Sequence, residues 1–204
     1  MLDQVLIIAG VTLLIMVSPG PDMLLVIRNT FAGGRAGGLL TSLGTLSGNL
    51  VHIGYCVAGI GWLISQSIVA FSVLKYAGAA YLLWLGLASF RARGERLEPA
   101  DGRQGPARRG WCVQRFVTNL LNPKGTLFYL GLFTVIIEPG TSAAGLLLLI
   151  ATTVAVSAAF WLVFVWTLDR PGLRRFIERW QLTVNRLFGG LLVFLGLRVA
   201  LLDR

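Results

Sequence analysis

The residues best able to do chemistry in this chain lie where its apolar stretches are interrupted. The first interruption falls inside the apolar stretch 5–27 and consists of Pro19, Gly20, Pro21 and Asp22. Proline removes a helical hydrogen bond and frees a carbonyl that lipid cannot satisfy, so such a break is tolerated only beside protein or a water-lined cavity. An ionisable side chain there costs about 2.5–3.5 kcal/mol on insertion scales, which marks Asp22 as a candidate substrate or ion site.

Two roles are open to Asp22. Because a low-dielectric interior disfavours its charged form, it could take up and release a proton as water access alternates between the two membrane faces. It could instead cap the helix that follows Pro21, accepting backbone N–H groups at the N-terminus of that helix. The two roles are compatible with each other.

A second interruption lies in the other half of the chain, inside the apolar stretch 116–137. It consists of Asn122, Pro123 and Lys124. Lys124 could pair with Asp22 or meet a substrate carboxylate, or its long side chain could reach the cytoplasmic surface. Two proline-broken segments, one in each half, indicate a transporter site at the interface of two repeats.

The stretch 39–64 carries a polar pair and a row of small residues. Asn49 and His52 are three positions apart and share a helix face, where they could form a proton relay or an interhelical hydrogen bond. Gly44 and Gly48 recur at the spacing that lets two helices approach closely, which is more often packing than transport.

The elements that must position these residues are apolar helices. The chain of 204 residues is 55% hydrophobic and 13% charged, and its mean hydropathy is +0.75, which is typical of a polytopic membrane protein. We expect an all-α fold with six transmembrane helices, of which the first and fourth are broken by proline. Their approximate bounds are 5–27, 39–64, 68–90, 116–137, 143–167 and 185–202. The tryptophans near segment ends suit an aromatic belt: Trp62, Trp84, Trp111, Trp161 and Trp166.

The net charge of +9 first suggests a nucleic-acid partner. The placement of the charge excludes one, because most basic residues lie in the short links 28–38, 91–115 and 169–186, as the positive-inside rule requires. These links are therefore expected in the cytoplasm, with both termini outside and the lipid bilayer as the surrounding partner.

The halves of the chain resemble each other. Residues 81–87 read Tyr-Leu-Leu-Trp-Leu-Gly-Leu and residues 191–197 read Leu-Leu-Val-Phe-Leu-Gly-Leu. We expect a first three-helix repeat over 1–90, a basic cytoplasmic linker over 91–115 and a second repeat over 116–204. Since three crossings place the second repeat in the opposite orientation, the repeat is predicted to be inverted.

The sequence leaves other classes of protein open. A membrane thiol–disulfide electron carrier needs two cysteines brought together, whereas Cys56 and Cys112 lie in different segments without CxxC spacing. A structural membrane subunit predicts that Asp22→Asn is silent. An enzyme is not expected, because neither a catalytic Ser/His/Asp set nor an HExxH motif can be named, and without a phosphate-binding loop the energy must come from a gradient.

Several motifs, taken in order, resemble the LysE/RhtB family of amino-acid exporters within the LysE superfamily. They are Ser-Pro-Gly-Pro-Asp at 18–22, Arg-Ala-Gly-Gly at 35–38, the stretch 75–87, Asn-Leu-Leu-Asn-Pro-Lys at 119–124 and the stretch 188–197. Two positions depart from the family: Asn49, where members often carry an acid, and Thr134, where they often carry proline. A neutral Asn49 cannot release a proton, so proton stoichiometry or substrate charge would differ.

The resemblance implies a multi-pass protein of the bacterial inner membrane that exports amino acids or related small metabolites by proton antiport. Its partners would be that substrate, protons and the bilayer, and no cofactor, metal or catalytic residue is expected. The sequence leaves the oligomeric state open, with a homodimer among the alternatives. Together the motifs and the polar pair give the expected substrate and ion pathway: Pro19, Gly20, Pro21, Asp22, Asn49, His52, Asn119, Asn122, Pro123 and Lys124.

Overall fold

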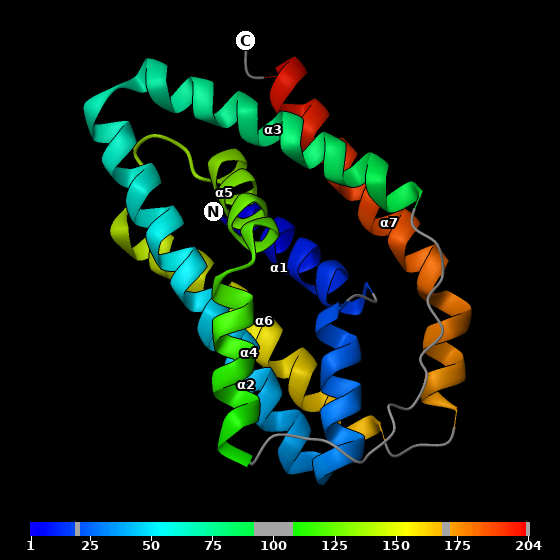
Figure 1. The fold of residues 1–204 in the computed structure, drawn as a ribbon. Helices are drawn as coiled ribbons and strands as arrows, with labels where there is room; N and C mark the ends of the chain where they lie inside the picture. The colour runs from blue at the N-terminus through cyan, green and yellow to red at the C-terminus, as the bar shows by residue number, and fades with distance from the viewer. Residues whose placement is uncertain (19–20, 92–107, 169–171, 203–204) are drawn as a thin grey trace.

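The computed structural model describes residues 1–18, 21–91, 108–168 and 172–202, and within these ranges the chain is entirely helical (Figure 1). The seven helices described are α1 (Leu2–Val17), α2 (Pro21–Gln66), α3 (Ile68–Phe90), α4 (Arg108–Leu120), α5 (Pro123–Ile136), α6 (Ala143–Thr167) and α7 (Leu173–Leu202). The all-α prediction is confirmed for this part of the chain.

Four of the described helices are long and apolar enough to cross a bilayer: α2, α3, α6 and α7. The shorter apolar helices are Leu2–Val17 and Gly125–Ile136. The first and fourth predicted segments are therefore not single helices in this structure. Segment 5–27 is divided between α1 and α2, and segment 116–137 is divided between α4 and α5.

α2 is longer than any predicted segment because it continues through the expected link 28–38. Its 46 residues are helical except at Gly33 and Gly34, where the backbone bends. Gly34 has a φ of 63°, a conformation that side chains with a Cβ rarely adopt. The expected link is thus a bend between two arms of one helix.

α4 and α7 also begin earlier than the sequence suggests. α4 starts at Arg108, inside the predicted linker 91–115, and α7 starts at Leu173, well before residue 185. The start of α4 is held by Trp111, whose buried indole lies against Gly33 at the bend of α2. Residues 92–107 of the predicted linker lie outside the described residues.

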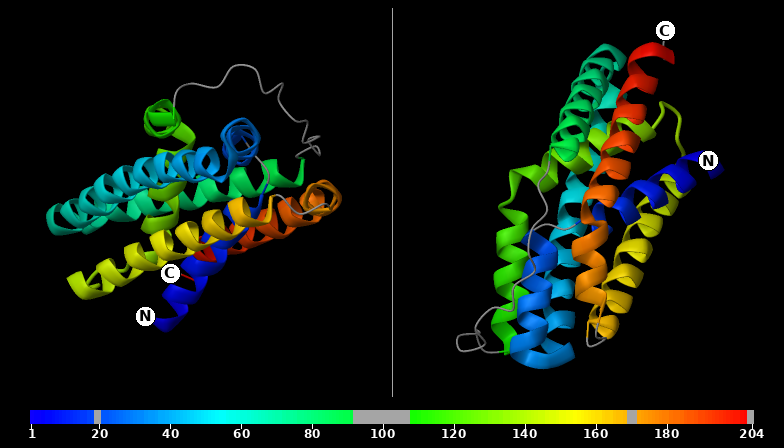
Figure 2. Two further views of the ribbon diagram at one scale, coloured as in Figure 1. Left: turned by 90° about the horizontal axis from the view of Figure 1, so that it is seen from below. Right: turned by 90° about the vertical axis from the view of Figure 1, so that its right-hand side faces the viewer.

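α3 and α7 pack closely along their lengths (Figure 1). A Cβ on Gly86 would lie 2.8 Å from the carbonyl oxygen of Gly189, and a Cβ on Gly196 would lie 2.9 Å from that of Ala79. As the residue number rises along α3 it falls along α7, so the two helices are antiparallel. Figure 2 shows the pair from two further directions.

α2 and α4 form the other extensive helix contact. A Cβ on Gly44 would lie 2.4 Å from the carbonyl oxygen of Cys112, and a Cβ on Gly48 would lie 2.4 Å from Oδ1 of Asn119. The small residues of α2 therefore serve helix packing, as the sequence favoured. This close approach also positions two polar residues of α4, Arg115 and Asn119, against α2.

Candidate functional site

A cavity of about 330 Å³ lies where the ends of four helices converge. α1 contributes residues near its C-terminus and α2 its first turn, while α4 contributes its last turn and α5 its start. The polar wall includes Ser18, Asp22, Asn49, Asn119, Asn122 and Asn185. The volume falls within the range of small-molecule sites.

The apolar wall of the cavity comes from both hydrophobic cores of the protein. Phe128 and Phe188 belong to the core built around α3, α5 and α7, and Met23 and Trp161 belong to the smaller core between α2 and α6. The cavity therefore lies at the junction of the two cores.

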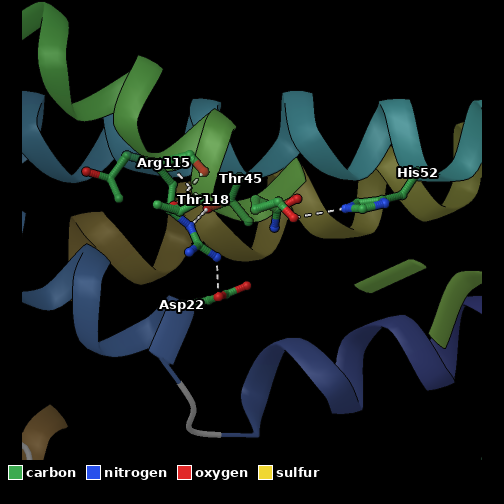
Figure 3. A network of polar contacts seen from close by, with 7 residues as sticks. Asp22, Thr45, His52, Arg115 and Thr118 are labelled. Atoms are coloured by element: carbon green, nitrogen blue, oxygen red, sulfur yellow. Dashed lines mark hydrogen bonds and ion pairs between the residues drawn. The ribbon is translucent and has the colours of Figure 1, made fainter. Parts of the chain in front are cut away.

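Asp22 forms an ion pair with Arg115, joining the start of α2 to α4 (Figure 3). The Arg115 side chain is only 7% exposed, whereas that of Asp22 is 39% exposed and lines the cavity. Arg115 is also held by Thr45, since its Nε donates a hydrogen bond of 3.0 Å to Thr45 Oγ1. The carboxylate thus faces the cavity while its cationic partner stands behind it.

The ion pair differs from the expected one. The sequence suggested Lys124 as a partner of Asp22 and placed Arg115 in a cytoplasmic linker, whereas Arg115 lies buried in α4. The position of Asp22 in the first turn of α2 is also favourable electrostatically, because a helix N-terminus carries partial positive charge.

His52 lies behind the cavity wall and joins α2 to α4 and α5. Its Nε2 is 3.0 Å from the carbonyl oxygen of Asn119, which can only accept, so Nε2 carries a proton and donates. In the neutral ring, Nδ1 then accepts from a hydroxyl, with Tyr55 Oη at 2.5 Å and Thr126 Oγ1 at 3.1 Å. His52 therefore makes an interhelical hydrogen bond, one of the two roles left open by the sequence.

Two buried polar atoms on cavity-lining residues have no hydrogen-bond partner within the described ranges. They are Oδ1 of Asn119, which lies over Gly48, and Nε1 of Trp161. Leaving such atoms unpaired costs about 1–3 kcal/mol each.

The structure brings together only some of the predicted pathway residues. Asp22, Asn49, Asn119 and Asn122 line the cavity, and His52 contacts the backbone of Asn119. The remaining positions lie wholly or partly outside the described residues: Pro19 and Gly20 entirely, and Pro21, Pro123 and Lys124 as regards their side chains.

Other site residues were missed by the sequence analysis. Arg115 was counted as a linker charge, although it lies four residues before Asn119 and so shares a helix face with it. The aromatic belt predicted from the sequence is wrong for Trp111 and Trp161, because both side chains are buried, that of Trp161 against the cavity. Asn185 lay at the edge of a predicted segment; in the structure it accepts a 2.5 Å hydrogen bond from Ser18 Oγ.

The described residues show no arrangement suited to metal or thiol chemistry. Among them, three or more His, Cys, Asp or Glu side chains nowhere gather into a metal site. Both cysteines are free thiols. Cys112 lies against Gly44, and Cys56 lies twelve positions after Gly44 on α2, a rise of about 18 Å, which is too far for a disulfide.

Comparison with known proteins places the chain among membrane translocators. The family model described as LysE type translocator matches residues 13–202. The chain is 29% identical over 202 residues to the uncharacterized membrane protein YahN of Escherichia coli K12, covering 97% of this chain and 89% of that protein. It is 30% identical over 188 residues to the homoserine/homoserine lactone efflux protein of Salmonella typhimurium LT2, covering 92% of this chain and 91% of that protein. No solved structure matches it significantly.

Proposed function

The chain belongs to the LysE type translocator family, whose members are transporters and not enzymes, and we propose that it is a secondary active exporter of amino acids or related small metabolites. A Salmonella relative is named for efflux of homoserine and homoserine lactone. Small polar amino acids, with L-homoserine first, are therefore the substrates to test.

The observation that carries this proposal is the convergence of four helix ends on one cavity whose polar wall includes Asp22. The N-termini of α2 and α5 carry partial positive charge, which suits a substrate carboxylate, and the C-termini of α1 and α4 carry partial negative charge. Asp22 suits the substrate ammonium. An amino-acid zwitterion thus finds complementary partners in a space of adequate size.

Proton antiport follows if Asp22 also serves as the proton site. A carboxylate that holds an ammonium group cannot hold a proton at the same time, so the two cations compete for one position. Substrate would leave on one side of the membrane and a proton would take its place for the return. The pathway we propose consists of Pro19, Gly20, Pro21, Asp22, Asn49, His52, Asn119, Asn122, Pro123 and Lys124.

Alternating access would come from an inverted repeat of three helices. The helix lengths support this, because each half begins with a short helix that ends at a proline break. That helix is α1, with 16 residues, in the first half and α4, with 13 residues, in the second; α5, which follows the second break, has 14 residues. The contacts also correspond between halves: α1 packs on α6 as α4 packs on α2. With an offset of 110 residues, the pair Gly86 and Gly189 maps onto Gly196 and Ala79, on antiparallel helices.

This repeat would form six crossings of the bacterial inner membrane. The basic links would face the cytoplasm and both termini the outside, in keeping with the positive-inside rule. The two repeats would comprise residues 1–90 and 116–204, and the second broken crossing would also include the part of α4 that precedes residue 116. A homodimer is the assembly to test by mass measurement in detergent.

The test is transport of labelled L-homoserine and a panel of amino acids by purified protein in proteoliposomes, with and without an imposed pH gradient. Gradient-driven movement of one class, reduced at least tenfold by Asp22→Asn at unchanged abundance, is the expected result. Asp3→Asn is the matched control, because Asp3 lies in the first turn of α1 outside the cavity. A folded protein that moves no member of the panel would refute the proposal.

A structural membrane subunit is the remaining alternative. It predicts that Asp22→Asn changes neither transport nor growth as long as the protein inserts. The half-exposed carboxylate on the wall of a cavity argues against it, because a purely structural ion pair gains nothing from facing an open space.

A further inference from the structure

We infer that Arg115 is a tethered competitor for Asp22: it holds the carboxylate in the empty site and is displaced each time a substrate ammonium binds. The inference rests on the proposed function, because it assigns the ammonium of an amino acid to Asp22. It adds a residue that sets substrate affinity from outside the cavity.

The placement of the two charges supports displacement. Asp22 is 39% exposed and lines the cavity, while the Arg115 side chain is 7% exposed. A ligand in the cavity therefore reaches the carboxylate from the side opposite the guanidinium. It meets an acid whose negative charge is already paired with an arginine.

Arg115 is tethered by contacts that do not involve Asp22. Its Nε donates to Thr45 Oγ1 at 3.0 Å, and the Thr45 hydroxyl in turn donates to the carbonyl oxygen of Thr41 at 3.3 Å. Its Cβ lies 3.0 Å from the point where a Cβ on Gly44 would stand, so α4 lies directly on α2 at this position. The guanidinium therefore stays within reach of Asp22 after it is displaced.

The same burial makes the displacement reversible. A buried cation without a partner is destabilised, so Arg115 reclaims Asp22 whenever neither a substrate nor a proton occupies the carboxylate. The substrate ammonium must therefore compete for Asp22 with the Arg115 guanidinium, which is part of the same chain and is always close by. The apparent affinity for substrate then falls in proportion to the fraction of sites in which Asp22 is free. If one site in ten is free, the half-saturating concentration is about tenfold higher than it would be without Arg115.

Arg115→Gln removes the competing charge and keeps a side chain that can hydrogen-bond to Thr45. It is compared with Thr45→Val, which keeps the charge and removes one tether. The measurement is the half-saturating concentration of labelled L-homoserine in proteoliposomes, beside N-acetyl-L-homoserine, which lacks the ammonium. We expect Arg115→Gln to lower the value for L-homoserine about tenfold and Thr45→Val to lower it less, with no change for the acetylated compound.

The outcomes separate the two proposals. An unchanged or raised half-saturating concentration for L-homoserine in folded Arg115→Gln, with an active wild type, overturns the tethered competitor and leaves the exporter standing. A wild type that moves none of the amino acids overturns both. If Arg115→Gln does not fold, Thr45→Val decides: a lower value supports the inference, and an unchanged or higher value overturns it.

Discussion

Gly189 of α7 lies so close to Gly86 of α3 that a Cβ on Gly189 would stand 2.7 Å from the carbonyl oxygen of Gly86. Real Cβ atoms essentially never approach backbone that closely, so the two helices are in contact through their main chains. In a bilayer, where lipid tails are as apolar as leucine, such close packing is a main source of helix association. The antiparallel pair is therefore sensitive to a single added methyl group.

Gly189→Ala is expected to destabilise the protein by about 1–3 kcal/mol, because the new methyl group forces α3 and α7 apart. For a chain of this size the midpoint of thermal unfolding in detergent should fall by about 2–12 °C. Gly190→Ala is the matched control, since a Cβ there meets nothing nearer than Phe90 Cζ at 4.0 Å. An equal fall in both variants would contradict the packing described here.

His52→Leu is expected to cost about 1–3 kcal/mol, because it leaves the carbonyl oxygen of Asn119 without its donor. Tyr55→Phe should cost less than about 1 kcal/mol, since the Thr126 hydroxyl remains 3.1 Å from His52 Nδ1 and can donate in its place. Thermal unfolding in detergent gives both values. A larger loss for Tyr55→Phe than for His52→Leu would reverse the assigned roles.

The Cys56→Ser, Cys112→Ser double variant is expected to retain wild-type efflux. Both thiols are free, and Cys56 is packed beside the backbone of Thr126 at 3.8 Å, where a serine hydroxyl can hydrogen-bond in its place. Efflux of labelled L-homoserine under an imposed gradient measures this. Loss of transport in a folded double variant would show that at least one of the two thiols is needed for transport.

Asn49→Asp is expected to let dibasic amino acids compete for the site. Asn49 is buried and lines the cavity with Asp22, so a second carboxylate would allow two positive charges to be held. We expect lysine to inhibit L-homoserine transport at a concentration at least about tenfold lower than in Asn49→Ser, since one favourable charge pair of about 1.4 kcal/mol suffices. Equal inhibition by lysine of Asn49→Asp and Asn49→Ser would show that residue 49 does not contact the second positive charge.

Much of this arrangement could be predicted from the sequence because its signals are local. Prolines at positions 19, 21 and 123 indicate where helices stop, and the four-residue spacing of Gly44 and Gly48 indicates a close helix contact. These signals led to both sides of the cavity and to Asp22, Asn119 and Asn122 on its wall.

The remainder depends on contacts between distant parts of the chain. Arg115 is preceded by a charged, glycine-rich stretch, and only the packing of α4 on α2 shows that it is buried beside Asp22. The bend at Gly33 and Gly34 resembles a loop in sequence, whereas Trp111 fills the space beside it and the helix continues on both sides.

Because α2 is bent, the contacts of Arg115 connect the parts of this helix on the two sides of the bend. Asp22 belongs to the arm before Gly33 and Gly34, Thr45 belongs to the arm after them, and Arg115 bonds to both. The guanidinium of Arg115, from α4, thus links the two arms of α2. If a substrate ammonium displaces Arg115 as proposed, Asp22 would lose this link to the second arm, and the angle between the two arms of α2 would be free to change when a single positive charge binds.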